Sequence, residues 1–233
     1  MDMKISLRAN KYGIVANALL KQSLSVADVG CRDGVLKKFL APQIKYVGID
    51  IQPGEHVTHI GNIEKGLPIA DRTFDAVVAL DILEHTDNIW GAFNELVRLA
   101  KYQVIISLPN MYHWWHRANF VLGREMNKYR LTATPVEDRH RWLPSFSATE
   151  SFSQEMALRS DLTCDLIGML GSRRHVLLDA LFLPISKDLA VWTTVVVFAK
   201  RDVYKVKHSQ DEQKIVVGPV LDESRYEHGD CND

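Results

Sequence analysis

Short apolar runs that alternate with helical segments restrict the fold of this chain more than any other feature. The strand-like runs lie at 26–30, 45–50, 74–80 and 102–108, and a shorter one lies near 56–60. Segments in which apolar residues recur at helical spacing separate these runs, chiefly 33–40 and 89–100. Strands that alternate with helices predict a parallel sheet with helices on both faces.

The two ends of the chain extend this pattern. Apolar residues recur at helical spacing from about 7 to 21, which predicts an amphipathic helix that packs on the sheet. A strand near 164–170, a helix around 174–182 and a closing strand at 190–200 follow in the second half. Residues from about 204 to 233 are polar and carry clusters of like charge, so we expect a partly disordered tail.

Composition bounds the partners and the compartment. A chain of 233 residues with 46% hydrophobic residues can bury one core, and its formal net charge of -1 gives no overall field for a nucleic acid or an anionic membrane. Cys31, Cys164 and Cys231 are odd in number and lack a CxxC pair, which favours a reducing compartment. The N-terminus lacks a long apolar stretch, and the run 189–199 is too short to span a bilayer. We therefore expect a cytoplasmic protein without a membrane span.

The turn in the stretch 26-VADVGCRDGVLKKFL-40 indicates a nucleotide site of unusual charge. The dinucleotide pattern requires glycines at three offsets, and this turn has only Gly30 and Gly34. Asp33 lies at the expected start of the following helix, where a carboxylate would repel a pyrophosphate, and Asp28 adds a second carboxylate. S-adenosylmethionine suits such a turn, because it is an adenine nucleoside that carries a sulfonium and an ammonium group instead of phosphates.

Asp50 adds a ribose-binding position to this turn. It ends the second predicted strand, roughly twenty residues beyond the turn, where a carboxylate can accept hydrogen bonds from both ribose hydroxyls. With this spacing the chain resembles the class I S-adenosylmethionine-dependent methyltransferases over about residues 25 to 200. The stretches that carry the resemblance are 28-DVGCRDG-34, 46-YVGID-50, 61-GNIEKGLPIADRTFDAVVALDILEH-85 and 105-IISLPN-110.

The resemblance implies a fold and a domain organisation. The fold would be α/β and Rossmann-like, with a mostly parallel seven-stranded sheet, an antiparallel last strand and helices on both faces. Residues 1–203 would form the methyltransferase domain, with an N-terminal helix within 1–24 and a substrate-side insertion or lid at 110–150, and 204–233 would form the polar tail. The segment 111–142 is long, aromatic and basic and lacks strand character, which is typical of such an insertion.

Cofactor-binding roles follow from the same resemblance. In this family the glycine turn holds the methionine part, the acidic residue after the second strand holds the ribose, and a residue after the third strand contacts the adenine. Carried over, these roles fall on Gly30 with Cys31 and Arg32, on Asp50 with Ile51, and on Asn62 with Ile63, and we place Asp28, Gly34 and Leu80 in the same site. Arg32 stands where the family commonly has a small residue, and Asn62 where it commonly has aspartate, although an amide can still accept from the adenine amino group.

The segment 111–142 is also the candidate acceptor pocket. The sulfonium is already activated, so the enzyme chiefly positions the acceptor and excludes water. Aromatic faces and guanidinium groups suit sugars, planar rings and acceptors with phosphate or carboxylate groups, although the aromatic residues could instead form a lid that packs on itself. The candidate bases are His113, His116 and His140, of which we choose His113 and His140, because imidazole titrates near neutral pH. The aromatic and basic residues are Tyr112, Trp114, Trp115, Tyr129 and Trp142 with Arg117, Arg124, Arg130, Arg139 and Arg141.

The stretch 81-DILEH-85 forms a second constellation. Asp81, Glu84 and His85 follow a strand and can project from one turn, and His140 can add a fourth ligand, which would offer a divalent metal oxygen and nitrogen donors. This is similar to the E-x-x-E-H arrangement of metal-assisted O-methyltransferases, including ubiquinone-pathway enzymes and small-RNA 2′-O-methyltransferases. A Leu-Glu-His triplet also occurs in family members without a metal, and this chain has Asp81 where those enzymes have glutamate. A metal is therefore the less favoured interpretation.

The sequence favours a methyltransferase that acts on a small or medium-sized acceptor such as a glycan, a lipid precursor or a natural product. Oxygen is the favoured nucleophile, because an (Asn/Asp)-Pro-Pro-(Tyr/Phe) tetrad, which would indicate amino-group methylation, is absent where 80-LDIL-83 stands. A nucleic-acid acceptor is disfavoured, because the chain has no recognisable single-strand-binding module and no overall basic charge.

Two other interpretations remain. The chain also resembles the methionine-biosynthesis W-type proteins, which share the short N-terminal helix and the LEH and PN motifs and act with an acyltransferase partner. In that case the chain would be a binding module that works with another enzyme. An NAD-dependent enzyme is the third interpretation, and the missing third glycine and Asp33 disfavour it.

Overall fold

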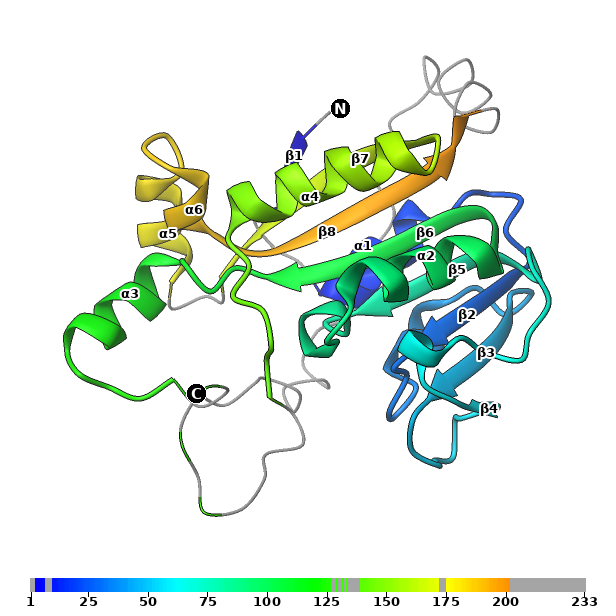
Figure 1. Ribbon diagram of the computed structural model, residues 1–233. Coiled ribbons are helices and arrows are strands. Elements are labelled where there is room, and N and C mark those ends of the chain that lie inside the picture. The colour runs from blue at the N-terminus through cyan, green and yellow to red at the C-terminus, as the bar shows by residue number, and fades with distance from the viewer. Residues whose placement is uncertain are drawn as a thin grey trace, which may run out of the picture.

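The computed structural model describes residues 3–6, 10–126, 129, 131, 133, 139–171 and 175–201. In this part of the chain eight strands form one sheet in the order β1-β7-β8-β6-β5-β2-β3-β4 (Figure 1). The pairs are parallel except those of β8, which runs antiparallel to both β6 and β7. The strands are β1 Met3–Ser6, β2 Ser25–Val29, β3 Lys45–Asp50, β4 His59–Ile60, β5 Phe74–Leu80, β6 Ala100–Pro109, β7 Leu162–Leu170 and β8 Val191–Lys200.

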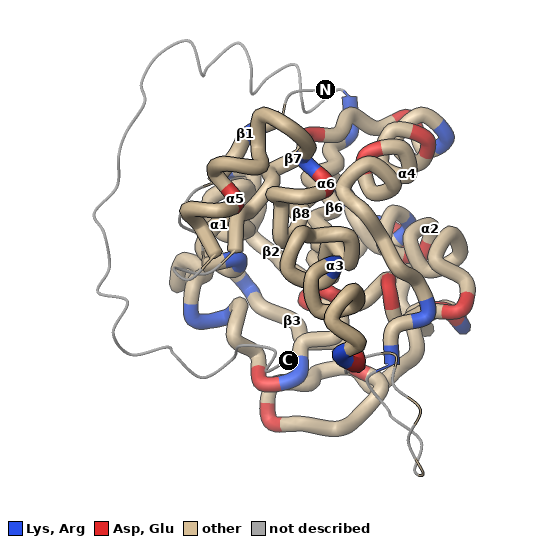
Figure 2. The backbone as a smooth tube through the Cα atoms, turned by 90° about the vertical axis from the view of Figure 1, so that its left-hand side faces the viewer, with Lys and Arg blue, Asp and Glu red and all other residues tan. Residues whose placement is uncertain are grey.

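Helices cover both faces of this sheet. In Figure 1, α2 and α4 lie on the face turned to the viewer, α1 lies behind the sheet, and α3, α5 and α6 lie together at one side. From that side, in Figure 2, α3 stands in front of the strands. The α-helices are α1 Lys11–Ala18, α2 Ile89–Leu99, α3 Trp114–Val121, α4 Phe146–Arg159, α5 Val176–Phe182 and α6 Lys187–Ala190, and the 3-10 helices are η1 Val35–Phe39, η2 Ile63–Lys65 and η3 Leu83–His85.

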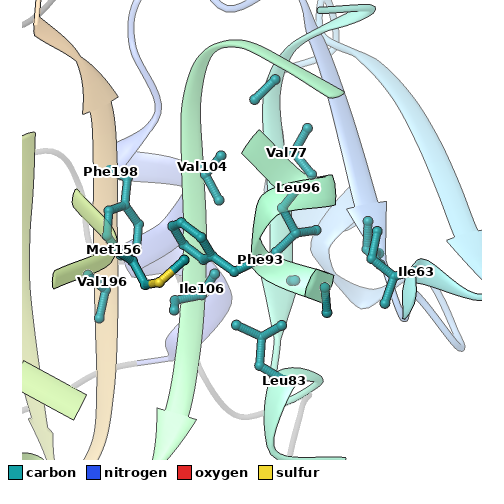
Figure 3. Close-up of a cluster of buried hydrophobic side chains, with 14 of the residues drawn as sticks. Ile63, Val77, Leu83, Phe93, Leu96, Val104, Ile106, Met156, Val196 and Phe198 are labelled. Carbon is teal, nitrogen blue, oxygen red and sulfur yellow. The ribbon is translucent and has the colours of Figure 1, made fainter. Parts of the chain in front are cut away.

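Two apolar cores fix these layers. Phe93 and Leu96 of α2 are fully buried against Val104 and Ile106 of β6 and Phe198 of β8, as Figure 3 shows. The helix faces the sheet because its apolar residues recur three and four positions apart, which places them on one side. On the opposite face a smaller core packs α1 and η1 against the same strands. The predicted α/β fold with helices on both faces is therefore confirmed.

The structure differs from the sequence expectation in three elements. The sheet has eight strands instead of seven, because Met3–Ser6, in the N-terminal segment 1–24 where we expected a helix and no strand, forms β1 and pairs with β7. The helix expected at 33–40 is the 3-10 helix η1, because Gly34 has a left-handed conformation and the following turns close over three residues. The sequence analysis assigned no helix to Phe146–Arg159, where α4 begins with a Ser145 side-chain cap.

The remaining expectations lie partly outside the described residues. The polar tail at 204–233 and Cys231 fall there, as do Arg130 and part of the segment 111–142. Within the described residues, every helix is too short or too polar to cross a membrane.

Candidate functional site

The turn after β2 depends on two glycines with positive φ. Gly30 has a φ of 73°, and a side-chain carbon added there would lie 2.0 Å from Cδ1 of Ile82. Gly34 has a φ of 61°, and an added carbon would lie 2.5 Å from Cγ of His56. The backbone N–H of Gly30 donates to the carbonyl of Ile49 at 2.7 Å, which ties the turn to the end of β3. Only glycine tolerates both the positive φ and the lack of space for a side chain at these two positions.

Asp50 lies beside this turn and is held by two backbone groups. The N–H of Arg32 donates to Oδ2 at 3.0 Å, and the N–H of Gln52 donates to Oδ1 at 3.1 Å. Arg32 has a φ of 42°, which is uncommon for a residue with a side chain and brings its N–H to the carboxylate. Each carboxylate oxygen can accept a further hydrogen bond. Arg32 therefore contacts Asp50 through its backbone N–H.

A cleft of about 450 Å³ opens at this edge, lined by residues 32–33 and 50–57. Its volume lies in the range of small-molecule sites. Asp33, Asp50 and Glu55 line it together with Arg32, so carboxylates outnumber guanidinium groups. A cleft of this charge favours a cationic ligand over a pyrophosphate. The short helix η1 has little dipole, so the carboxylates themselves carry this argument.

Asp28 lies on β2 just before the turn, and only 5% of its surface is exposed. Tyr46 donates its hydroxyl hydrogen to Oδ2 at 2.9 Å. Burial raises the pKa of Asp28 to about 7, an effect that Tyr46 opposes and Asp50 increases. Burial likewise raises the pKa of the Cys31 thiol. Near neutral pH Asp28 can therefore release a proton when a cation binds nearby, whereas Cys31 stays a thiol.

The other expected cofactor residues lie around the same edge in different surroundings. The Asn62 side chain accepts from the N–H of Glu64 at 2.8 Å and caps η2, and the preceding N–H of Gly61 donates to the carbonyl of Asp50. Ile63 is buried in the core, as Figure 3 shows. The other members of the expected set are Ile51, which is 65% exposed, and Leu80, which is partly buried on the opposite core.

Asp81 follows β5 and is bound by two residues from other parts of the chain. The ammonium group of Lys11 on α1 forms an ion pair with Oδ2, and the hydroxyl of Ser107 donates to Oδ1 at 2.5 Å. Burial would raise the pKa of Asp81, but Lys11 and Ser107 outweigh it, so the pKa lies below its usual value. Sequence reasoning missed Lys11, because no local pattern links residues 70 positions apart.

The structure brings Glu84, His85 and His140 together, as the sequence constellation suggested, but not Asp81. One donor atom from each of the three lies within 4.8 Å of the others. His140 is 7% exposed, and its ring contacts those of His85 and Tyr129. Among the described residues, this is the one cluster of three such side chains with metal-binding spacing.

His113 occupies a different position from His140. It is fully buried, and its Nε2 lies 2.9 Å from Oδ1 of the equally buried Asp179. The N–H of Trp115 donates to Nδ1 at 3.2 Å, so both ring nitrogens are engaged. The Trp114 indole and the N–H of Gly171 also donate to Asp179, each at 2.6 Å. Burial lowers the pKa of His113 to about 4, although Asp179 raises it. This arrangement favours a structural role.

The aromatic residues expected to line an acceptor pocket divide between these two histidines. Trp114 and Trp115 pack with His175 near His113, and the sequence did not reveal His175, Asp179 or Trp192 as members of this cluster. Trp142 and Tyr129 lie near His140, where the Tyr129 hydroxyl donates to the carbonyl of Trp142 at 2.7 Å. The basic residues are more exposed. Arg117 donates to the carbonyl of Tyr112, Arg124 to Asn119, and Arg141 pairs with Asp87, while the Arg139 carbonyl faces His85.

Comparison with known proteins gives the family and the fold. The sequence model described as "Methionine biosynthesis protein MetW" matches residues 9–160. No curated protein sequence matches the chain. Among solved structures, a SAM-dependent methyltransferase of Thermotoga maritima shares 15% identity over 82% of this chain and 88% of its own, with a TM-score of 0.52.

Two further structures show the same likeness. The small RNA methyltransferase HEN1 shares 14% identity over 82% of this chain but only 24% of its own, with a TM-score of 0.55. The third is a complex of the Haloferax volcanii Trm112 methyltransferase activator with a chain named as a methyltransferase. It shares 11% identity, covers 81% of this chain and 88% of its own, and has a TM-score of 0.51. At such identities the likeness shows the Rossmann-like class I methyltransferase fold alone.

Proposed function

The chain belongs to the family of the methionine biosynthesis protein MetW, and we propose that it binds S-adenosylmethionine and transfers the methyl group to a small or medium-sized acceptor in the cytoplasm. The acceptor is a glycan, a lipid precursor or a natural product, and oxygen is the methylated atom. Nucleic acid is not the acceptor in this proposal. In the view of Figure 2, Lys and Arg of the described residues lie interspersed with Asp and Glu, which fits this choice.

The arrangement around Asp50 is the observation that supports cofactor binding most strongly. Two backbone N–H groups orient its carboxylate, and each oxygen can still accept from a ribose hydroxyl. The adjoining cleft of about 450 Å³ has room for a nucleoside, and its carboxylates suit a positively charged ligand. Ile82 fills the space where a side chain at Gly30 would lie, so this packing holds the turn in the conformation that places the Arg32 N–H against Asp50.

Methyl transfer requires the chain to orient the acceptor and to accept one proton. When bound, the cofactor supplies a methyl group on a positively charged sulfur. As the carbon–oxygen bond forms and the carbon–sulfur bond breaks, a base must take the proton of the acceptor hydroxyl. His140 is this base in the proposal, because His113 uses both of its ring nitrogens in a buried network. Tyr129 and Trp142 beside His140 would exclude water.

A binding module that acts with a partner enzyme is the second candidate. Apolar side chains remain exposed on neighbouring helices at the α3 side of the molecule, including Phe120 at 73%, Val121 at 83% and Leu177 at 83%. Exposed apolar residues gathered on adjacent helices are typical of protein contacts. The solved complex of a methyltransferase-fold chain with an activator protein shows that this fold can work in such an assembly.

Ligand binding and turnover separate the three interpretations. Differential scanning fluorimetry should show a rise in melting temperature with S-adenosylmethionine and none with NADH. Labelled S-adenosylmethionine, incubated with pools of sugars, lipid precursors and phenols, should then give a labelled product. Binding without turnover in any pool would favour the module, whereas stabilisation by NADH alone would overturn the proposal.

A further inference from the structure

Main-chain hydrogen bonds join η3 to residues 139–142, although the two segments are far apart in the sequence. The N–H groups of Arg141 and Trp142 both donate to the carbonyl of Glu84, at 2.8 and 3.3 Å. The indole N–H of Trp142 donates to the carbonyl of Thr86 at 2.7 Å. The backbone therefore sets how closely the side chains of the two segments approach.

Three side chains with metal-binding atoms meet at this junction. Glu84 is fully buried, His140 is 7% exposed and His85 is partly buried. One donor atom of each lies within 4.8 Å of the other two, and the centroids of the two imidazole rings lie 4.7 Å apart. Side chains this close can move onto a shared ion by small rotations, since ligand bonds to such ions are about 2.0 to 2.2 Å long.

The surroundings of His85 fix the tautomer that a metal requires. Its Nδ1 lies 3.1 Å from the carbonyl oxygen of Arg139. A carbonyl can only accept, so Nδ1 carries the hydrogen and Nε2 carries the lone pair. Histidines that ligate metals commonly donate from the other ring nitrogen to a backbone carbonyl in this way. The imidazole of His85 is therefore oriented as a ligand.

We propose that Glu84, His85 and His140 bind one divalent transition-metal ion. Two imidazole nitrogens and one carboxylate oxygen favour Mn²⁺, Fe²⁺, Co²⁺ or Zn²⁺ over Mg²⁺ and Ca²⁺, which prefer oxygen ligands. Three protein ligands also leave coordination positions for water or for an acceptor oxygen.

The position of this site gives the ion a role that rests on the proposed function. Ile82 lies two residues before Glu84 in the sequence, and its side chain packs against Gly30 in the turn after β2. An ion here would lie between the cofactor edge and the aromatic segment. A hydroxyl bound to the ion would have a lowered pKa and would give its proton to water before methyl transfer, so His140 would serve as a ligand and no longer as the base. The acceptor would then be a compound that binds metals through a hydroxyl oxygen.

A titration with Co²⁺ tests this site without reference to activity. The full chain, produced without a histidine tag and stripped with a chelator, should bind one equivalent of Co²⁺ in calorimetry and develop a visible absorption band. Glu84→Gln and His140→Gln should each weaken binding at least ~100-fold, more than changes outside the ligand set usually do. His59→Gln, a substitution on the exposed strand β4, is the matched control and should leave the affinity unchanged.

Two measurements keep the test decisive. If a ligand variant does not fold, crystals of the unmodified chain soaked in Mn²⁺ should show an anomalous peak among the three side chains. No Co²⁺ binding, equal binding by the ligand variants, or no peak at this position would each overturn the proposal. Asp50→Ala should lose affinity for S-adenosylmethionine and keep its affinity for Co²⁺, so failure of the metal site and failure of the proposed function are distinguishable.

Discussion

The cofactor edge, our name for the proposed cofactor site at the turn 30–34 and residues 50–57, and the α3 side of the molecule are built in opposite ways. At this edge, a turn with two glycines of positive φ lies beside an open cleft, backbone N–H groups orient Asp50, and Ile51 is 65% exposed. On the α3 side, His113 and Asp179 are fully buried in a network of aromatic rings. The first region leaves carboxylate and backbone groups open to a ligand, whereas the second satisfies its polar groups internally.

This difference suggests separate roles: the open edge for ligand binding and the buried network for the stability of the fold. A substitution in the buried network should act chiefly on the stability of the fold, because its groups already have partners. A substitution of Asp50 at the open edge should act on the affinity for the cofactor, because this carboxylate is only partly engaged. The packed Gly30 and the buried Asp28 of the same edge should also affect stability. Each prediction below tests whether the two regions behave separately.

Loss of the Asp179 charge should have the largest effect on stability. Asp179→Asn removes one carboxylate oxygen from a network that receives three hydrogen bonds, from His113, Trp114 and Gly171. We expect the free energy of unfolding to fall by about 4 kcal/mol, since breaking a buried charged network leaves its partners unsatisfied. Urea denaturation followed by circular dichroism measures this loss.

Asp188→Asn is the matched control for this prediction. Asp188 accepts hydrogen bonds from Ser147 at a more exposed position, so its loss should cost about 1 kcal/mol or less. Among the surviving folded molecules, the affinity for S-adenosylmethionine should be the same in both variants. Equal stability losses, or a strong effect of Asp179→Asn on cofactor affinity, would show that the two regions are not separate.

A side chain at Gly30 should cost about 3 kcal/mol of stability. Gly30→Ala combines a left-handed backbone with a carbon that would lie 2.0 Å from Ile82. Gly123 has a similar φ of 71° but no atom within 4 Å of an added carbon, so Gly123→Ala should cost only about 1 kcal/mol. Thermal unfolding of both variants measures the difference. Equal losses would mean that the turn can shift away from Ile82.

The sequence indicated which residues meet at the ends of β2 and β3 better than it indicated which residues meet on the α3 side, for a physical reason. Gly30, Gly34 and Asp50 belong to short stretches whose spacing along the chain already places them at one sheet edge. The Glu84 and His140 pair could also be suggested, because the DILEH stretch marks one of its members. His113 and Asp179 are 66 residues apart in the sequence, and Lys11 and Asp81 are 70 apart, so no local sequence pattern predicts these pairs. The sequence did not predict β1 for the same reason, since its partner strand β7 is distant in the sequence.

Asp28 should make the stability of the chain depend on pH. Its pKa is about 7 in the folded state, compared with an ordinary value of 3.8, so the folded chain holds a proton that the unfolded chain releases between these values. The stability from this proton is fully present below the ordinary pKa and is lost as the pH rises through about 7. Between about pH 5 and pH 8 the loss should be about 3 kcal/mol.

Asp28→Asn isolates this effect. The variant should lose less stability than the unmodified chain over the same pH range, as measured by urea denaturation at each pH. In the unmodified chain, the affinity for S-adenosylmethionine should rise over that range, because the ionised carboxylate attracts a cationic ligand. Identical pH profiles for the two proteins would show that Asp28 does not titrate near neutral pH.

Calorimetric titration with S-adenosylmethionine tests the central claim, that Asp50 at the open edge holds the cofactor. The unmodified chain should bind one equivalent, and Asp50→Ala should weaken binding by about 1 to 3 kcal/mol, the range for losing a charged hydrogen-bond partner. The Asp188→Asn control should bind like the unmodified chain. No binding by the unmodified chain, or an unchanged dissociation constant for Asp50→Ala, would contradict the account.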